Sequence, residues 1–417
     1  MIFLINPKDK FLKLSGDRAP LGISYLSSYL KDKGHDVKLF DLNHNHIDEY
    51  IVRLYSEKPD YVGFSMPTPC VNDVVDIVRL SKGISPDTKF IAGGNHPTNC
   101  PQDDVYNEFD FVVRGEGEKT LELILNNKTT EHIIIGEPIK DLDSLPFPDY
   151  EGIKLERYGM KLNGKKGSLM VTSRGCVYNC IYCPSSRIKN VRVRSPGNII
   201  DEMMMLYYNH KVRGFYFGDD VFTLNKNRVY EFCKQLKDVR EEHGIHNITW
   251  RCTTRSNLVD KDLLGEMKES GCDIISIGIE SHNNYFLNII KKGITKEENE
   301  QTIRDAKEVG MKVKGFFILG LPTQTYQDCL DTIKYARCLN LDYVDFYPLC
   351  PYPGTELWDN PDKFGLKYEK PNGNWKEYYQ VGKEQHDWKL IHPNITQQQM
   401  NRLLTKAKNI QKGDTYQ

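Results

Sequence analysis

The chain has no apolar run long enough to cross a membrane and no excess of charge of either sign. Its longest apolar stretches are strand-sized, whereas a membrane-spanning helix needs about 20 apolar residues. The formal net charge is −1 over 417 residues. No basic block interleaved with aromatics occurs, so nothing indicates a nucleic-acid surface. Residues 1–6 lack the basic region and cleavage site of a signal peptide and are predicted to form a strand.

A disulfide framework is also missing. Eight of the 11 cysteines are dispersed, mostly inside predicted strands and helices. Free, buried thiols of this kind are typical of a reducing cytoplasm. The other three lie in one short loop with the spacing Cys-x3-Cys-x2-Cys, at Cys176, Cys180 and Cys183.

Three thiolates in one loop favour a particular kind of metal site. They cannot all pair as disulfides, and they leave a tetrahedral metal one ligand short. A zinc site usually recruits a fourth Cys or His at a recognisable spacing. A [4Fe–4S] cube held by three thiolates keeps one iron open to an outside ligand, which suits a catalytic cluster. The open-iron cluster is our working hypothesis, with a structural zinc loop and chance clustering of buried cysteines as alternatives.

Residues 1–137 alternate apolar strands with amphipathic helices, which predicts an α/β domain with a Rossmann-like, doubly wound parallel sheet. The predicted strands are Ile2–Ile5, Val37–Asp41, Tyr61–Ser65, Phe90–Ala92 and Phe111–Val113. Ligands of such sheets bind beyond the carboxyl ends of the strands. Polar and glycine-containing segments occupy these positions, and paired glycines there let the backbone approach a large planar or anionic ligand.

A linker is predicted at residues 138–166, followed by a second strand–helix series at 167–355. Its predicted strands are Ser168–Thr172, Gly214–Phe217, Ile248–Cys252, Ile274–Ile279, Lys314–Leu319 and Tyr343–Tyr347. Six such units are too few for a closed eight-stranded barrel. Residues 356–417 end in a predicted helix, Gln397–Gln411, which Thr396 and Gln399 would cap. This C-terminal segment either covers the mouth of the second domain and shapes a substrate pocket, or only packs against it.

The cysteine spacing, with Tyr182 directly before the last cysteine, resembles the radical S-adenosylmethionine (SAM) superfamily. The six strand–helix units match the partial (βα)6 TIM-type barrel of that family, whose active site lies at the C-terminal strand ends. The resemblance implies that Cys176, Cys180 and Cys183 hold a [4Fe–4S] cluster. It also implies that the amino and carboxylate groups of SAM chelate the fourth iron, and that the reduced cluster cleaves SAM to a 5′-deoxyadenosyl radical.

The resemblance places the contacts with SAM in the loops at these strand ends. They are expected at Tyr182, Gly218, Asp219, Asp220, Arg255, Glu280 and Leu319. Asp219 and Asp220 stand where the family usually has a turn that holds the amino group, and carboxylates can hold an ammonium by charge-assisted hydrogen bonds. Arg255 is expected on the SAM carboxylate and Glu280 on the ribose hydroxyls. An Asx turn and a surface salt bridge are the plainer alternatives for the aspartates and for Arg255.

The N-terminal loops, in this order, resemble the cobalamin-binding domain that precedes the radical SAM core in one large subgroup. Contacts with cobalamin are expected at Asn6, Pro7, Leu21, Gly22, Ser65, Met66, Pro67, Thr68, Gly93, Gly94, His96, Gly115 and Glu116. The Asp-x-His-x-x-Gly motif that supplies a histidine to cobalt in other cobalamin proteins is absent. That subgroup generally lacks this ligand, so the resemblance implies no protein histidine on cobalt. Residues 66–68 are expected on the lower side, and His96 either contacts the corrin or caps its own loop.

The function implied is that of a cytoplasmic, oxygen-sensitive, cobalamin-dependent radical SAM methyltransferase. A methyl group from one SAM would pass through methylcobalamin to an unactivated carbon of a small molecule, peptide or protein. A second SAM would supply the radical, with electrons from a flavodoxin- or ferredoxin-type donor. The alternatives are a cobalamin-dependent cyclase, rearrangement or oxidation enzyme, and a non-catalytic corrinoid- or metal-binding protein. A methylthiotransferase is less favoured, because those enzymes carry three further N-terminal cysteines where this chain has Cys70 and Cys100.

Overall fold

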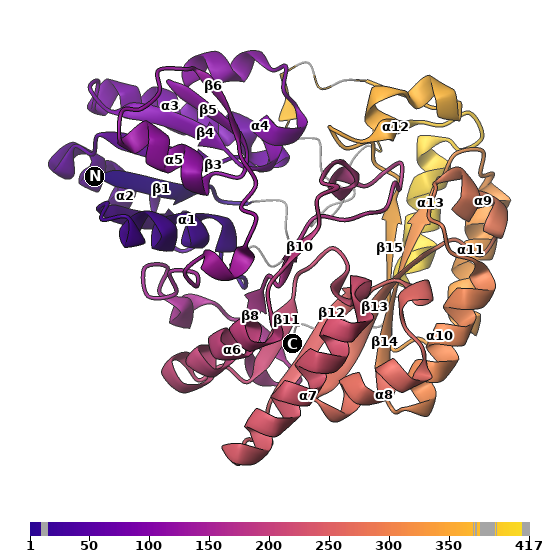
Figure 1. The fold of residues 1–417 in the computed structure, drawn as a ribbon. Helices are drawn as coiled ribbons and strands as arrows, with labels where there is room; N and C mark the ends of the chain where they lie inside the picture. Colours follow the sequence, from indigo (N-terminus) through magenta and orange to yellow (C-terminus); the bar gives the residue numbers. More distant parts are fainter. Residues whose placement is uncertain (10–15, 370, 372, 376–387, 389, 411–417) are drawn as a thin grey trace. The chain divides into compact units, whose positions relative to one another are not determined.

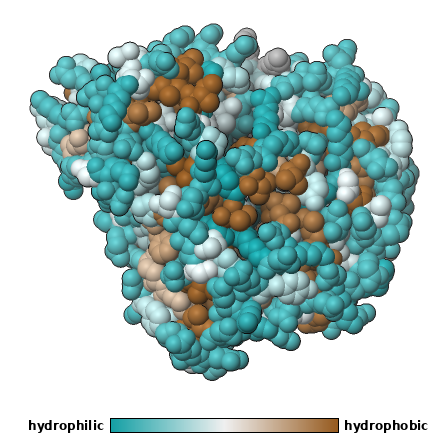
Figure 2. All heavy atoms as spheres, viewed as in Figure 1, coloured by the Kyte–Doolittle hydropathy of each residue, from teal (hydrophilic) through white to brown (hydrophobic). Residues whose placement is uncertain are grey.

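The computed structural model describes residues 1–9, 16–369, 371, 373–375, 388 and 390–410 (Figure 1). The chain divides into two compact units. Unit 1 holds Met1–Gly159 together with Lys370–Glu384, and unit 2 holds Met160–Glu369 together with Gln385–Gln417. Hydrophilic residues make up most of the surface drawn in Figure 2. Within the described residues, we find no helix with the length and apolar character that crossing a membrane requires.

Unit 1 is built on one parallel sheet, as its sequence predicts. Its six strands lie in the order β2-β1-β3-β4-β5-β6, and every neighbouring pair is parallel. The strands are β1 (Ile2–Asn6), β2 (Val37–Asp41), β3 (Tyr61–Ser65), β4 (Lys89–Gly93), β5 (Phe111–Gly115) and β6 (Ile133–Gly136). The longer helices between them are α1 (Leu21–Asp32), α2 (Ile47–Glu57), α3 (Val71–Ile84) and α5 (Glu118–Leu125).

Strand β1 is apolar at almost every position because both faces of the sheet are covered. Successive side chains of a strand point to opposite faces. Ile2 and Leu4 join a buried cluster with residues of α1 and α5, whereas the ring of Phe3 lies 5.1 Å from that of Phe40. A strand buried on both sides has no polar face to alternate with, which explains the continuous apolar run.

Two elements of unit 1 lie outside the predicted pattern. Helix α4 (Asn95–Asn99) follows β4 directly and contains a proline. Strand β6 adds a sixth strand beside β5, and Ile135 on it is 78% exposed. Such short elements carry too few residues for a periodic signal. The predicted linker belongs to unit 1 as far as Gly159.

Unit 2 contains the predicted partial barrel. Its sheet has the order β15-β14-β13-β12-β11-β8-β7, and all neighbours from β8 to β15 are parallel. The strands are β7 (Lys161–Leu162), β8 (Lys165–Met170), β11 (Gly214–Phe217), β12 (Thr249–Thr254), β13 (Cys272–Glu280), β14 (Lys312–Leu319) and β15 (Tyr343–Pro348). The short strand β7 pairs antiparallel with β8 and was not predicted.

Helices connect the parallel strands of unit 2 and pack side by side (Figure 1). They are α6 (Pro196–His210), α7 (Lys226–Glu242), α8 (Lys261–Glu269), α9 (Asn284–Ile289), α10 (Lys296–Glu308) and α11 (Tyr326–Cys338). An aromatic cluster of Phe217, Phe222, Phe232 and Trp250 fills the space between β11, β12 and α7, with ring centroids 5.0–5.8 Å apart.

The C-terminal helix α13 (Gln397–Lys408) confirms the predicted start. Thr396 and Gln399 form a reciprocal capping box at its N-terminus, which satisfies two backbone N–H groups that the helix leaves without partners. The helix packs on α11 and β15 within unit 2. The helix ends at Lys408, and Gln411, where it was predicted to end, lies outside the described residues.

Asp149 ties the end of unit 1 to helix α1. Its carboxylate accepts hydrogen bonds from the Ser27 hydroxyl and the Lys31 ammonium, both at 2.6 Å, and from the backbone N–H of Gly152 at 2.9 Å. Burial alone would raise the pKa of Asp149, but these hydrogen bonds outweigh burial and hold the pKa below its usual value. The stabilisation is present above the unfolded-state pKa and is lost as pH falls through the lower folded-state pKa.

We therefore expect Asp149→Asn to reduce the free energy of unfolding of unit 1 by about 1–3 kcal/mol at pH 7, because the amide cannot accept all three bonds. The midpoint of urea-induced unfolding measures the effect. Glu137→Gln, which removes an exposed carboxylate in the same region, is the matched control. Equal unfolding midpoints for the two variants would contradict a stabilising role of the Asp149 hydrogen bonds.

Candidate functional site

The three predicted cysteines lie in a loop that begins at the carboxyl end of the first parallel strand of unit 2. The loop follows β9 (Ser173–Arg174), and Gly175 at its start has φ +96°. A Cβ at Gly175 would lie 2.8 Å from the carbonyl oxygen of Ile188 and 3.0 Å from that of Asn190. Cys176 N–H donates to the same Ile188 oxygen at 2.9 Å. Only glycine allows the chain to turn this tightly into the cysteine segment.

The cysteine side chains are free thiols, two of them buried and Cys183 half-buried. Burial raises the pKa of Cys176 and of Cys183, so these two groups need a bound metal to hold them as thiolates at neutral pH. A single zinc ion, with Zn–S bonds of about 2.3 Å, would bring its thiolates to about 3.8 Å from one another. In the described part of the chain the three sulfurs do not form a group whose ligand atoms lie within 4.8 Å. The donor set therefore fits a cluster with separate iron corners better than one ion.

Asp219 braces the strand that leads into the cysteine loop. One carboxylate oxygen accepts from the backbone N–H of Thr172 at 2.6 Å, and the other accepts from the Thr172 hydroxyl at 2.5 Å. Arg228 donates to the same Thr172 hydroxyl at 2.7 Å. Burial raises the pKa of Asp219 against these hydrogen bonds, which lower it. Both oxygens are engaged inside the protein, so this side chain positions backbone before the cysteine loop. The expected contact of Asp219 with the SAM amino group stays a prediction.

The neighbours of Asp219 lie differently. Asp220 accepts from the hydroxyl of Ser185 at 2.6 Å, just beyond the last cysteine, and its carboxylate is exposed. Gly218 packs against β8, where a Cβ would lie 2.8 Å from Leu169. Leu319, the last residue of β14, is fully buried. Asp220 is thus bonded two residues after the last cysteine.

Tyr182 and Glu280 meet at the mouth of unit 2. The Tyr182 hydroxyl donates to Glu280 Oε1 at 2.9 Å, and burial followed by the charge of Glu280 raises the pKa of Tyr182. Lys292 donates to the same oxygen at 2.6 Å and is only 7% exposed. Lys292 was missed by sequence reasoning, because a lysine in a polar loop after a short helix gives no signal until its partner is known.

Glu280 reaches this position through an unusual backbone. It has φ +65°, and the pairing of β13 with β14 shifts register between Gly278 and Glu280. A left-handed conformation costs a non-glycine residue free energy and clusters at functional sites. A Cβ at Gly278 would meet the Lys292 ammonium at 2.5 Å. The strand end is therefore shaped around the pair of Glu280 and Lys292.

Arg255 links the cysteine loop to the segment that carries Lys292. Its guanidinium lies 3.5 Å above the ring of Tyr178 and 3.9 Å from the sulfur of Cys180. The same group donates to the carbonyl oxygens of Lys292 and Gly293. Its Nε–H is buried and has no hydrogen-bond partner in the structure. One donor of Arg255 is thus left for a ligand, while the rest of the group supports the loop.

The predicted glycines of unit 1 line the carboxyl edge of its sheet. Gly94 has φ +95°, and a Cβ there would lie 3.2 Å from the backbone nitrogen of Met66. Gly115 has φ +85° and lies equally close to Gly136. Gly22, at the start of α1, has nothing within 4 Å of an added Cβ. Gly94 and Gly115 thus let neighbouring loops pack closely at this edge, whereas Gly22 borders open space that a ligand can approach.

Several other predicted residues of this edge are engaged inside the protein. Asn6 donates to Asp41 at 2.9 Å, and Glu116 accepts from the backbone of Ile139 at 2.7 Å. Met66 and His96 have no exposed surface, and Leu21 and Pro7 are buried. The half-exposed or exposed members of the set are Asn6, Gly22, Ser65, Pro67, Thr68, Gly93, Gly94, Gly115 and Glu116.

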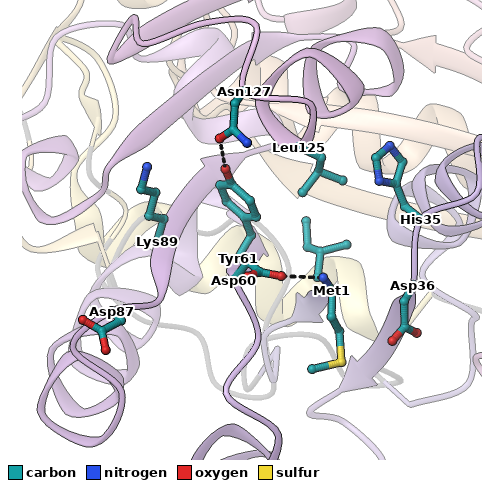
Figure 3. Close-up of a pocket in the computed structure, with 10 residues that line it drawn as sticks. Met1, His35, Asp36, Asp60, Tyr61, Asp87, Lys89, Leu125 and Asn127 are labelled. Atoms are coloured by element: carbon teal, nitrogen blue, oxygen red, sulfur yellow. Dashed lines mark hydrogen bonds and ion pairs between the residues drawn. The ribbon is translucent and has the colours of Figure 1, made fainter.

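A pocket of about 410 Å³ lies at the opposite edge of the same sheet (Figure 3). It is lined by Ile2, Tyr61 and Lys89 at the amino ends of β1, β3 and β4. Tyr61 donates to Asn127 across it at 3.0 Å. Cofactors of doubly wound sheets bind at the carboxyl edge, so this pocket is separate from the expected cofactor site.

Comparisons with known proteins find a matching family for the sheet domain of unit 1 and for the partial barrel of unit 2. Residues 170–336 match the radical SAM superfamily, and residues 8–125 match the B12 binding domain. These two matches identify the cofactors of the chain as a [4Fe–4S] cluster, SAM and cobalamin.

Curated relatives match over most of this chain. An uncharacterized methyltransferase, PH0819 of Pyrococcus horikoshii, is 32% identical over 93% of this chain and 86% of its own. The anaerobic magnesium-protoporphyrin IX monomethyl ester cyclase of Rubrivivax gelatinosus is 28% identical over 83% of this chain and 67% of its own. The fold matches that of the radical SAM methyltransferase TsrM from Kitasatospora setae, solved with cobalamin and a [4Fe–4S] cluster bound. The TM-score is 0.78 at 15% identity, over 99% of this chain and 89% of that one. The chain therefore belongs to the radical SAM enzymes that carry an N-terminal B12 binding domain.

Proposed function

We propose that this enzyme transfers a methyl group from SAM, by way of cobalamin, to an unactivated carbon of a small molecule, peptide or protein. The observation that carries the proposal is a three-thiol loop at the strand ends of a partial barrel in the same chain as a B12 binding domain. The relative of 32% identity is named a methyltransferase. When bound, the cluster supplies reductive cleavage of SAM and cobalamin supplies methyl transfer.

Cys176, Cys180 and Cys183 are the proposed cluster ligands. Gly175 sets the direction in which the loop leaves the strand, and Asp219 with Arg228 fixes the strand itself. Arg255 brings positive charge to within 3.9 Å of the Cys180 sulfur. Positive charge and N–H donors near a ligand sulfur stabilise its thiolate form.

Tyr182, Glu280 and Lys292 are the proposed nucleoside side of the SAM site. Glu280 accepts from both neighbours, and a carboxylate held in the charged form can also accept from ribose hydroxyls. Lys292 places its positive charge 2.6 Å from this buried carboxylate. The free Nε–H of Arg255 is the proposed donor to the SAM carboxylate.

Cobalamin is proposed to lie against the glycine-containing carboxyl edge of unit 1, near Gly22, Gly94 and Gly115. His96 is held by protein partners on both ring nitrogens, which supports a cobalt without a protein histidine. The enzyme is proposed to work in the reducing cytoplasm with an external flavodoxin- or ferredoxin-type electron donor, because the cluster needs one electron for each SAM that it cleaves.

A second candidate function keeps both cofactors but forms a ring or rearranges a carbon skeleton. The 28% identical relative named as a cyclase favours it. Product mass separates the two. Methylation replaces a hydrogen with a methyl group and yields one S-adenosylhomocysteine and one 5′-deoxyadenosine per product, whereas cyclisation adds no methyl group and yields no S-adenosylhomocysteine.

Cys180→Ala tests the cluster assignment. The anaerobically reconstituted wild type should bind four irons and convert SAM to 5′-deoxyadenosine under strong reduction. The variant should lose this product by at least about 100-fold, because chemistry that depends on an intact cluster fails completely when a ligand is lost. It should keep its cobalamin. Cys338→Ala, which removes an exposed thiol elsewhere in unit 2, is the control. Retained 5′-deoxyadenosine formation in Cys180→Ala would refute the assignment.

Lys292→Met tests the buried pair. The change leaves Glu280 without its opposite charge, and we expect SAM to bind about 10-fold more weakly to the reconstituted protein, a difference of about 1.4 kcal/mol. Equilibrium dialysis with labelled SAM measures it, and Lys292→Arg should recover part of the affinity.

The adjacent Lys291 provides the control. It is 45% exposed at its side chain and pairs with Glu356 at 2.5 Å, away from Glu280. Lys291→Met should bind SAM as the wild type does. If Lys291→Met and Lys292→Met bind SAM equally well, the Glu280–Lys292 pair is not part of the SAM site.

A further inference from the structure

A short piece of the C-terminal segment belongs to unit 1, although about 200 residues of unit 2 precede it in the chain. Unit 1 includes Lys370–Glu384, and residues 373–375 are described within it. We call residues 373–375 the latch. The sequence predicted that the whole region 356–417 would pack on the barrel, so this return to the first unit was not expected.

Asn72 holds the backbone of the latch. Its side-chain amide donates to the carbonyl oxygen of Gly373 at 2.7 Å and accepts from the backbone N–H of Trp375 at 2.9 Å. Asn72 lies in the first turn of α3, two residues after the short helix η1 (Thr68–Cys70). A single amide therefore satisfies two backbone groups of the latch, in the way that a neighbouring strand would.

Trp375 occupies a site made by the loop after β4. Its indole N–H donates to Asp103 Oδ2 at 2.6 Å, and its ring meets the His96 ring edge-on with centroids 4.5 Å apart. Trp375 is 4% exposed. Edge-to-face contacts of this kind stabilise by about 0.5–1.5 kcal/mol beyond the burial itself.

His96 and Asp103 extend the network to the loop after β3. His96 Nε2 lies 3.2 Å from Asp103 Oδ2, and Nδ1 lies 3.4 Å from the Thr68 hydroxyl. The carboxylate assigns the proton to Nε2, which leaves Nδ1 to accept from Thr68. Asp103 also accepts from the backbone N–H of Val105 at 3.1 Å. The latch is thus bonded, directly or through one residue, to two of the loops that carry expected contacts with cobalamin, those after β3 and β4.

The geometry points to Trp375 as a positioning residue of the cobalamin site. Through Asp103 and His96, it fixes the loops after β3 and β4 in the shape that receives the corrin, so unit 1 needs the latch to bind its cofactor tightly. This inference rests on the proposed binding of cobalamin at the carboxyl edge of unit 1. It assigns a role in the cobalamin site to Trp375, which lies far in sequence from the residues 8–125 that match the B12 binding domain.

A metal ion is the competing occupant of the same place. Ligand atoms of His96, Cys100 and Asp103 lie within 4.8 Å of one another. Asp103 Oδ2, however, already accepts from two N–H groups, and His96 Nε2 carries a proton in the arrangement described. Metal-binding imidazole needs a free lone pair. The hydrogen-bond network and a metal at these atoms therefore exclude each other.

Affinity for hydroxocobalamin, measured by equilibrium dialysis on the full chain, tests the inference. Trp375→Ala should bind at least 10-fold more weakly than the wild type. Trp375→Phe keeps the contact with His96 but loses the indole donor, and it should fall between the two. Iron content after reconstitution and SAM binding should be unchanged, because these belong to unit 2. Trp358→Ala is the matched control, since Trp358 lies in the same C-terminal region but packs on Tyr368 of unit 2.

Three results would overturn parts of the account, and they are distinguishable. If Trp375→Ala and the wild type bind hydroxocobalamin equally well, the inference fails while the proposed function stands. If the wild type itself binds none, the proposed function fails. Stoichiometric zinc in the purified protein that is lost in Cys100→Ala would replace the network with a metal site. Should Trp375→Ala fail to fold, Trp375→Phe and Asn72→Ala decide the question by the same measurement.

Discussion

The loop that carries the three proposed cluster ligands, Cys176, Cys180 and Cys183, depends on the groups that hold its backbone in place. Three ligands fix a cube only if their backbone does not move when the open iron exchanges its outside ligand. In unit 2 this support comes from groups that never touch the expected cluster. Asp219 and Arg228 are bonded to Thr172 before the loop, and the turn at Gly175 admits no other residue. Arg255 joins the loop to a neighbouring strand end.

The need to hold these loops in place also explains why the buried charged groups at the strand ends of unit 2 have partners. Isolated buried charges are costly, whereas paired and hydrogen-bonded ones are tolerated. Glu280 has Lys292 and Tyr182 as partners, and the strained backbone at Glu280 turns the carboxylate toward them. In unit 1, His96, Asp103 and Trp375 form a corresponding, largely buried network at the edge where cobalamin is proposed to bind. In both units, paired and hydrogen-bonded polar groups make the loops that are proposed to hold a cofactor rigid.

The fold and the chemistry of the cysteine loop could be predicted from the sequence, because both depend on patterns of residues that lie close together in the chain. Strand–helix alternation predicted the parallel sheet and the partial barrel, and Thr396 with Gln399 predicted the start of α13. Contacts between residues that lie far apart in the chain could not be predicted from the sequence. Asp219 follows its strand as expected, but which way its side chain turns depends on Thr172, 47 residues earlier. Lys292 and Trp375 have no local signature at all, since each is defined by a partner that only the folded chain brings near. The short elements α4 and β6 were missed because four or five residues do not establish a period.

The central claim is that one iron of a cluster on Cys176, Cys180 and Cys183 is open to SAM. Mössbauer spectroscopy of protein reconstituted with ⁵⁷Fe tests it most directly, because it reports each iron separately. The account predicts a cuboidal cluster in which one iron site differs from the other three and changes its signal when SAM is added. Four irons that are indifferent to SAM, or a protein that takes up zinc at these cysteines and no iron, would contradict it.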